Sequence, residues 1–325
     1  MSSPDVPAID DQLTQLAREG LRFDVSTRTR LQMSGEDRVK FLHNLSTAEI
    51  KRLAPAQGCE TFIPTLQGKI FGHFFVLPTA DSIYLSGVPR QAEPLLPHFQ
   101  KYAVIEDVEV ADRTAETTEY LLAGPQAAAW VEQLCGVAPP KAPLQAVASD
   151  DMLAYRTPFV AGPAWGVICR GQASRRAAEE ASNWPSGTAE TLDALRIEAG
   201  FPVYGQDVTV ENLAQEANRN ETAISFTKGC YLGQETIARI DALGHVNRRL
   251  FGFRLAGSTG DARSPVGATW EVEGKTAVQV TSAVYSPRRQ AWIGLAMVRR
   301  GFDRPGQTLE TSHGAVEIVA IPFAE

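Results

Sequence analysis

The 325-residue chain has few cysteines, and their spacing excludes several kinds of site. Cys59, Cys135, Cys169 and Cys230 lie far apart, with no Cys-x-x-Cys or Cys-x-x-His pair. Zinc ribbons and ferredoxin-type clusters need such local spacing, so we expect no structural metal. We interpret Cys59, Cys135 and Cys169 as small buried hydrophobic residues, and disulfides are disfavoured in a reducing compartment.

Long apolar runs and clustered basic residues are also missing. No stretch approaches the roughly 18 apolar residues that a membrane helix needs. The N-terminal MSSPDVPAIDDQL is acidic and lacks the pattern of a secretory signal. The net charge is −7 and no run of Lys or Arg forms a basic stripe, which disfavours nucleic-acid binding through bulk charge. We therefore expect a cytoplasmic protein that binds neither membranes nor nucleic acids directly.

What is present is the composition of an ordinary globular protein, with 44% hydrophobic and 21% charged residues. The Pro-rich segment 136–147 is typical of a linker or a long surface loop. Apolar periodicity and turn residues predict the regular elements. In chain order these are a helix over 9–20, a strand over 29–33, a helix after a Ser34–Asp37 capping box, a hairpin of strands 70–78 and 82–87, a strand over 103–110, a hairpin within 155–170, and a helix over 188–199 that ends at Gly200.

From Arg249 onward the pattern changes to short strand-like segments separated by Gly, Pro and charged turns. This spacing predicts a small antiparallel barrel or sandwich. We expect an α+β region over residues 1–245, built from two intertwined subdomains, followed by an all-β domain over residues 246–325.

Two polar residues mark the end of the predicted 188–199 helix, in the stretch LRIEAGFPVYGQD. Arg196 and Glu198 are two positions apart and point to different sides, which is also what solvated helix charges do. A ligand gives a second interpretation. The edge of a pterin presents two parallel N–H donors, and a carboxylate accepts such a pair. Glu198, beside the aromatic Tyr204, has the chemistry to bind that edge.

One cysteine lies in the tight polar segment SFTKGCYLGQETIARI. Gly229 and Gly233 permit close backbone approach or positive φ, and helical spacing resumes near Gly233. Cys230 therefore precedes a helix N-terminus and lies two residues from Lys228, and both features favour the thiolate. The simpler alternative is that Cys230 only fills a tight loop.

Two charged residues follow on the same predicted helix. Glu235 and Arg239 are spaced as an i,i+4 pair, which is worth only about 0.3–0.5 kcal/mol on a solvated helix face. This alternative explains both residues without a ligand.

These stretches, with QEAN at 215–218 and GHVNRRL at 244–250, resemble the folate-binding branch of the glycine-cleavage T-protein superfamily. More narrowly, they resemble YgfZ-type proteins, whose K-G-C-[YF]-x-G-Q-E signature is present here at 228–235. The resemblance implies three domains around a central channel, the last a small β-barrel. It also implies tetrahydrofolate or a derivative as ligand, and a role in making or maintaining iron–sulfur clusters, with cluster-containing client or assembly proteins as partners. Bacterial members are linked to radical enzymes that modify tRNA.

Taken with the resemblance, the motifs nominate the site residues. Cys230 is the candidate catalytic residue, with Lys228 in support. The candidate folate-binding residues are Glu198, Arg196, Tyr204, Tyr231, Gln234, Glu235 and Arg239.

One departure bears on activity. Aminomethyltransferases carry an essential aspartate shortly after the glycine pair that corresponds to the LQGKI turn, whereas here no acid follows Gly68 before Asp81. His73 lies in this apolar stretch and is more simply structural, although it has a proton-transferring group. The chain thus favours an accessory role over the glycine-cleavage reaction. A folate-dependent aminomethyl- or methyltransferase, and a folate-responsive scaffold without chemistry, stay open as alternatives.

Overall fold

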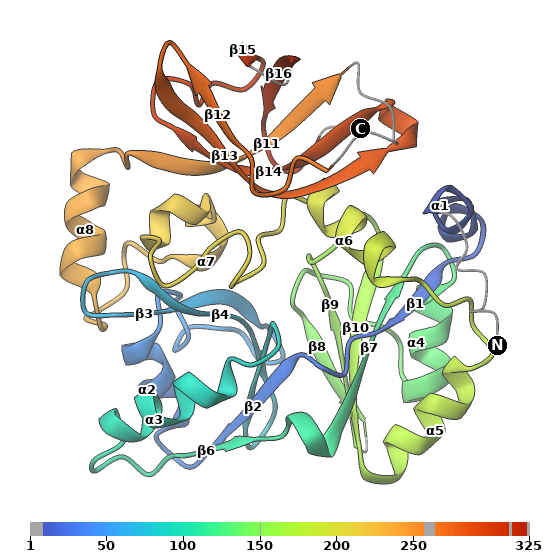
Figure 1. Ribbon diagram of the computed structural model, residues 1–325. Coiled ribbons are helices and arrows are strands. Elements are labelled where there is room, and N and C mark those ends of the chain that lie inside the picture. The colour runs from blue at the N-terminus through green and yellow to red at the C-terminus, as the bar shows by residue number, and fades with distance from the viewer. Residues whose placement is uncertain (1–8, 150, 257–263, 312–313, 324–325) are drawn as a thin grey trace.

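The computed structural model describes residues 9–149, 151–256, 264–311 and 314–323. Two five-stranded sheets lie side by side, and a third sheet of six strands lies across them (Figure 1). We name the first two by a central strand. The β4 sheet has the order β3 (Cys59–Pro64), β4 (Ile70–Pro78), β5 (Ile83–Gly87), β2 (Thr29–Ser34) and β6 (Glu109–Asp112). The β7 sheet has the order β1 (Leu21–Asp24), β7 (Thr117–Ala123), β10 (Ala164–Arg170), β9 (Met152–Arg156) and β8 (Ala146–Ser149).

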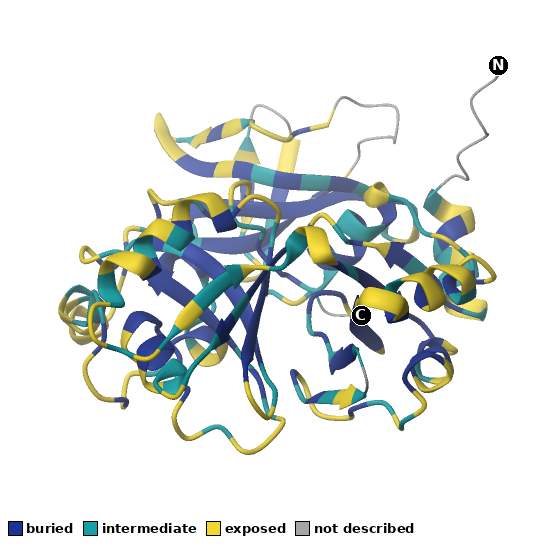
Figure 2. Ribbon diagram, turned by 90° about the horizontal axis from the view of Figure 1, so that it is seen from below, coloured by how far each residue is buried: buried dark blue, intermediate teal, exposed yellow. Residues whose placement is uncertain are grey.

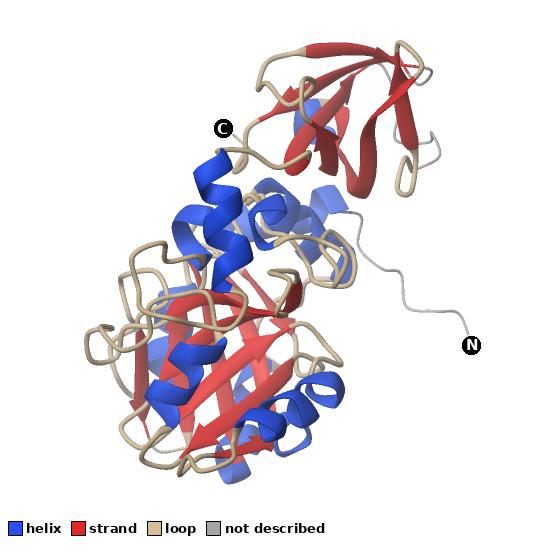
Figure 3. Ribbon diagram, turned by 90° about the vertical axis from the view of Figure 1, so that its left-hand side faces the viewer, coloured by secondary structure: helices blue, strands red, loops and turns tan. Residues whose placement is uncertain are grey.

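The C-terminal part forms a nearly closed antiparallel barrel of six strands, as the sequence predicts. A helical layer that includes α6, α7 and α8 separates this barrel from the two lower sheets in both Figure 1 and Figure 3. The barrel strands are, in sheet order, β12 (Thr269–Val272), β13 (Lys275–Ser286), β14 (Ala291–Arg299), β11 (Arg248–Ala256), β16 (Gly314–Val319) and β15 (Thr308–Thr311).

Eight α-helices are present in the described residues. Helices α2 and α3 pack on the outer face of the β4 sheet, and α4 and α5 pack on the outer face of the β7 sheet. Their bounds are α1 Ile9–Arg18, α2 Arg38–Leu45, α3 Ala92–Tyr102, α4 Ala127–Cys135, α5 Gly171–Ala181, α6 Ala189–Glu198, α7 Asn220–Ala223 and α8 Gln234–Leu243.

The two lower sheets pack against each other through strand β4. Its side chains alternate between two cores, with Phe74 and Val76 beneath α2 and α3, and Phe75 and Leu77 against the β7 sheet. A strand that is buried on both faces has a continuous apolar sequence, and IFGHFFVLP is one. Figure 2 shows that buried residues concentrate in the strands, while exposed residues lie on the outer helices and loops.

Most predicted elements are confirmed near their expected bounds, but two local predictions are wrong. The segment 103–110 is not a strand, because the chain is irregular until β6 begins at Glu109. Val104 and Ile105 are 79% and 91% exposed, and their N–H groups donate to the Glu106 carboxylate instead of to a sheet. The capping box is also absent, since the Asp37 carboxylate accepts the N–H of Asp107 at 3.0 Å rather than capping α2.

Candidate functional site

Helix α6 is fixed at both of its ends. The Thr188 hydroxyl accepts the N–H of Thr191 at 3.2 Å and caps the start of the helix, as predicted. Gly200 then ends it with φ +65°, where a Cβ would come within 2.4 Å of the side chain of Ile321. The last helical residue is Glu198, whose carbonyl accepts the N–H of Phe323 at 3.0 Å.

The Glu198 carboxylate has no hydrogen-bond or ion-pair partner among the described residues. It is only partly exposed, at the junction between α6 and the C-terminal segment. Carboxylate oxygens without a protein donor are open to water or to a ligand that donates hydrogen bonds. The carboxylate oxygens of Glu198 are thus not used by any described residue.

Arg196 lies in a buried ionic cluster that joins α6 to the barrel. Its Nη1 donates to Asp207 Oδ2 at 2.5 Å, and its Nη2 donates to the Ser282 hydroxyl on β13 at 2.6 Å. Its Nε donates to Asp193 Oδ1 at 2.6 Å. Because all three guanidinium nitrogens are engaged and the side chain is 1% exposed, Arg196 holds the helix in place beside Glu198.

Tyr204 follows α6 and forms an isolated bridge with Val208. Its ring is half-buried against the apolar cluster that also contacts Ile321 and Phe323, and burial raises the pKa of the Tyr204 hydroxyl. Phe323, whose N–H donates to the Glu198 carbonyl, packs against the same cluster as Tyr204.

Lys228 is buried and points away from solvent, into the turn that follows α2. Its Nζ donates to the carbonyls of His43, Ser46 and Ala48 at 2.6, 2.8 and 2.7 Å. Burial lowers the pKa of Lys228 to about 7, while three carbonyl acceptors favour the protonated amine. Its contacts therefore fasten the Cys230 loop to the end of α2 and the turn that follows it.

Cys230 is exposed and lines a surface cavity of about 490 Å³. Cys135 and Cys169 are buried, and burial raises their pKa values to about 11 and about 12. Cys59 is partly buried, and burial raises its pKa to about 12 as well. The other residues around the Cys230 cavity are His43, Asn44, Leu45, Lys51, Tyr102, Gly229, Tyr231 and Leu232.

Tyr231 connects this cavity to α8. Its ring is buried 4.7 Å from the Lys228 ammonium, and burial raises the pKa of its hydroxyl to about 12. Gly233 precedes the helix with φ +76°, and a Cβ there would come within 2.3 Å of the Thr65 carbonyl oxygen.

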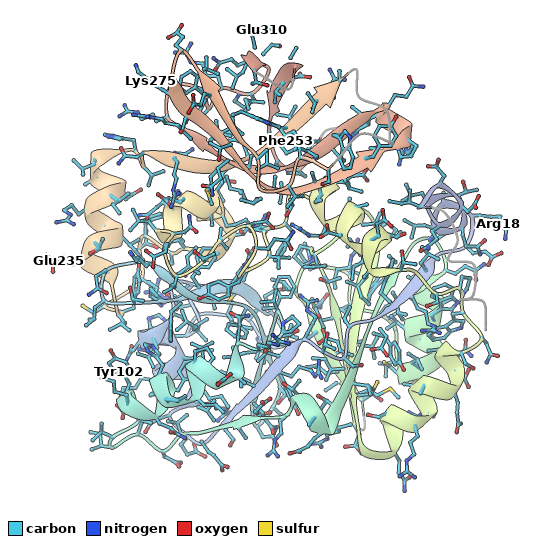
Figure 4. All side chains as sticks on the ribbon, in the orientation of Figure 1. Arg18, Tyr102, Glu235, Phe253, Lys275 and Glu310 are labelled. Carbon is cyan, nitrogen blue, oxygen red and sulfur yellow. The ribbon has the colours of Figure 1, made fainter. Side chains whose placement is uncertain are left out.

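Helix α8 carries the remaining predicted residues. Gln234 is its first residue, and Glu235 and Arg239 are exposed, with no ion pair between them in the described structure. Glu235 points outward from the molecule (Figure 4).

The predicted site residues thus form two groups. Glu198, Arg196 and Tyr204 surround the end of α6, while the residues from Lys228 to Arg239 belong to the loop and helix at α8. Helices α6 and α8 lie toward opposite sides of the molecule in Figure 1.

Known protein families and a solved structure match this architecture. The GCVT N-terminal domain family matches residues 5–228, and the glycine cleavage T-protein C-terminal barrel domain matches residues 248–323. The chain belongs to the glycine cleavage T-protein family. The solved aminomethyltransferase T of the glycine cleavage system from Bartonella henselae shares the fold, with a TM-score of 0.86 and 19% identity over 98% of this chain and 89% of that one.

Curated relatives of this T-protein family chain carry different names. A chloroplastic protein of Arabidopsis thaliana with a provisional transferase name is 29% identical over 92% of this chain and 70% of its own length. The tRNA-modifying protein YgfZ of Colwellia psychrerythraea is 27% identical over 74% of each chain. The mitochondrial aminomethyltransferase of Gallus gallus is 29% identical over 88% of this chain and 76% of its own length.

Sequence reasoning missed one buried polar group of this T-protein family member. Glu60 on β3 accepts hydrogen bonds from Arg219 and contacts His73 Nε2 at 2.7 Å. His73 stacks on Phe201 with ring centroids 5.2 Å apart, and Phe75 and Phe159 pack around Phe201. The available signal was a lone acid in the apolar strand CETFIP.

The described part of this T-protein family chain has neither a membrane-spanning helix nor a cluster of metal ligands. None of its helices combines the length and apolar character needed to cross a bilayer. No group of three or more His, Cys, Asp or Glu side chains there is arranged to hold a metal ion. The cytoplasmic location and the lack of a structural metal stay predictions.

Proposed function

We propose that this T-protein family chain binds tetrahydrofolate or a derivative at the end of α6 and supports iron–sulfur cluster biogenesis or maintenance as an accessory protein. Its client proteins would be cluster-dependent enzymes such as radical enzymes that modify tRNA. The observation that carries the folate part is the partly buried Glu198 carboxylate without a protein partner in the described chain. The relative named as a tRNA-modifying protein supports the second part.

The residues proposed for the α6 site have the chemistry that a pterin needs. The carboxylate would accept the two parallel N–H groups of the pterin edge, and the half-buried Tyr204 ring would supply apolar contact. Arg196 would act as a positioning residue. It lies two residues before Glu198, and its three hydrogen bonds hold α6 in place. The Glu60 group needs no ligand, because its acceptors are already used by Arg219 and His73.

Cys230 would be the catalytic residue of the second group of site residues, those from Lys228 to Arg239. Lys228 fixes its loop, Tyr231 lines the same cavity, and Gln234, Glu235 and Arg239 follow on α8. Because this group lies away from Glu198, we propose that the thiol meets another part of the folate or a client protein rather than the pterin edge. Its exposure on a cavity of about 490 Å³ supports access by such a partner.

Calorimetric titration with tetrahydrofolate and 5-formyltetrahydrofolate tests the folate proposal. Glu198→Gln replaces an acceptor by a donor that faces a donor, so the affinity should fall at least tenfold. Glu190→Gln, at an exposed position of the same helix, makes the same chemical change and should leave the affinity unchanged. Equal folate affinity in wild type and Glu198→Gln would remove this assignment.

A folate-dependent aminomethyl- or methyltransferase is the second candidate, favoured by the aminomethyltransferase among the relatives. Against it, the stretch from Gly68 to Ala80 contains no acid, and His73 is held by Glu60 inside the core. Turnover of a one-carbon tetrahydrofolate donor with a small amine acceptor would establish the transferase. A folate-responsive scaffold predicts instead that cluster-dependent activities survive replacement of Cys230 by Ala.

A further inference from the structure

A cavity of about 1030 Å³ lies where the segment after α8 enters the barrel. It is bordered by the start of β11 and by the end of β14 with the turn that follows. Its lining is strongly basic for a chain whose net charge is −7. The charged lining residues are Arg248, Arg249, Arg299, Arg300, Arg304 and a single carboxylate, Asp303.

The barrel itself brings two of these arginines together. Arg248 on β11 and Arg299 on β14 are direct partners in the antiparallel register. Like charges placed directly opposite each other on a sheet are destabilising. The next residue along, Arg300, is tied to the same place because its N–H donates to the carbonyl of Asn247 at 2.9 Å. The strand pairing therefore concentrates positive charge at one end of the barrel.

Little of this charge is neutralised within the described chain. Arg248 Nε contacts Glu216 Oε2 at 3.2 Å, but Arg299, Arg300 and Arg304 have no carboxylate within ion-pair distance there. The carboxylate of Asp303 accepts the N–H of Gly301 at 2.9 Å.

Arg249 adds a buried donor without an acceptor. Its Nε is inaccessible to solvent and has no hydrogen-bond partner in the described structure. It also borders a smaller adjoining cavity of about 70 Å³, where Gln215 Oε1 and Asn220 Oδ1 are likewise buried without partners. That space is large enough for one or two waters, which would satisfy its acceptors. They leave the larger basic cavity without a counter-charge.

We propose that this arginine cavity binds a small oligoanion, a molecule that carries two or more carboxylate or phosphate groups along a chain. Guanidinium groups bind both kinds of anion in a bidentate geometry. The volume is in the range of small-molecule sites, which favours such a ligand over a nucleic-acid duplex. The polyglutamyl chain of a folate and a polyphosphate share this chemistry. The proposal does not require pterin binding at Glu198.

Titration calorimetry with two probes that contain no pterin distinguishes the sources. Tripolyphosphate and penta-γ-glutamate are titrated into the full chain at about 50 mM and about 200 mM salt. At least one should bind, more weakly at the higher salt because exposed charges are screened. Glutamate or inorganic phosphate alone should bind at least tenfold more weakly than the corresponding chain. The probe that binds more tightly identifies the source.

The paired variant Arg299→Gln/Arg300→Gln should weaken binding of that probe at least tenfold. Its thermal midpoint without ligand should not fall, because the substitution relieves the repulsion between Arg248 and Arg299. The control Arg52→Gln/Arg175→Gln removes the same charge from exposed positions elsewhere and should keep at least a third of the affinity. Absence of binding by both probes, or equal weakening in both paired variants, would overturn the proposal.

Discussion

The Arg219 guanidinium forms a two-point ion pair with the Glu60 carboxylate, which lies 159 residues earlier in the chain. Nε donates to Oε1 at 2.9 Å and Nη2 donates to Oε2, while His73 contacts Oε1 from the neighbouring strand. Arg219 precedes α7, so this ion pair attaches the helical layer beneath the barrel to the edge of the β4 sheet.

Removing the charge of Glu60 should destabilise the fold. Glu60→Gln leaves the Arg219 charge without its buried partner, and such a loss costs about 3–5 kcal/mol. Urea denaturation followed by circular dichroism measures the change in the free energy of unfolding. Glu221→Gln, an exposed acid two residues after Arg219, is the matched control and should cost under about 0.5 kcal/mol. A similar small cost for both variants would contradict this role.

The same group should give the protein an acid-sensitive component of stability. Burial raises the pKa of Glu60, but the Arg219 charge and the hydrogen bonds from His73 and Arg219 outweigh it and lower the pKa from 4.5 to about 2. Between these values the unfolded chain binds more protons than the folded one, so the stabilisation is complete above about pH 4.5 and is lost as the pH falls toward 2. The shift corresponds to about 3 kcal/mol. Denaturation midpoints between about pH 6 and about pH 3 should fall more steeply in wild type than in Glu60→Gln.

Asp207 should be essential for the attachment of the barrel. Its Oδ1 accepts the hydroxyls of Thr281 and Ser282, and its Oδ2 accepts Arg196 Nη1 and the N–H of Val203. Asp207→Asn should destabilise the protein by about 3–5 kcal/mol because a buried charge pair is broken. Asp193→Asn is the control, since that carboxylate bonds the same arginine but is 38% exposed, and it should cost under about 1 kcal/mol. Equal costs would mean that burial does not set the strength of this cluster.

Lys228 should matter for the fold of the Cys230 loop. Lys228→Met removes the donor shared by three buried carbonyls, and each unsatisfied acceptor costs about 1–3 kcal/mol, so we expect a loss of at least about 3 kcal/mol. Hydrogen exchange should quicken around residues 43–50, where those carbonyls lie. Lys51→Met, at an exposed position on the Cys230 cavity, should leave the hydrogen exchange of residues 43–50 unchanged. Normal protection of this turn in Lys228→Met would contradict the anchoring role.

Cys230 should be the first thiol to be alkylated in the native protein. Burial raises the pKa values of the other three thiols and shields their sulfur atoms, whereas Cys230 is exposed on a cavity. One equivalent of iodoacetamide near neutral pH should modify Cys230 in most molecules, as peptide mass spectrometry will show. Native Cys230→Ala should react at least tenfold more slowly while keeping its thermal midpoint within a few degrees. Preferential labelling of Cys59 in wild type would refute the expected order.

Local patterns determined much of the architecture. Helical periodicity with Thr188 and Gly200 sufficed for α6, since capping and a positive φ are properties of a few neighbouring residues. The apolar run at 70–78, the hairpin partner at 82–87 and the strand spacing after Arg249 likewise predicted β4, β5 and the barrel. Where the pattern was misleading, as at Val104 and Ile105, a nearby carboxylate competed for the backbone N–H groups.

The roles of individual charged residues were decided only by the tertiary structure. The sequence by itself singled out Arg196, Lys228 and Cys230 through their motif, but it contained no information on what each side chain meets. Arg196 bonds Asp207 and a barrel serine, Lys228 bonds a turn that lies at least 180 residues earlier in the chain, and Cys230 stays exposed. The pairing of β11 with β14 also created the arginine cavity from segments that show no basic run. Electrostatic interactions depend on distances and burial in three dimensions, and these are set by packing between segments rather than by their spacing along the chain.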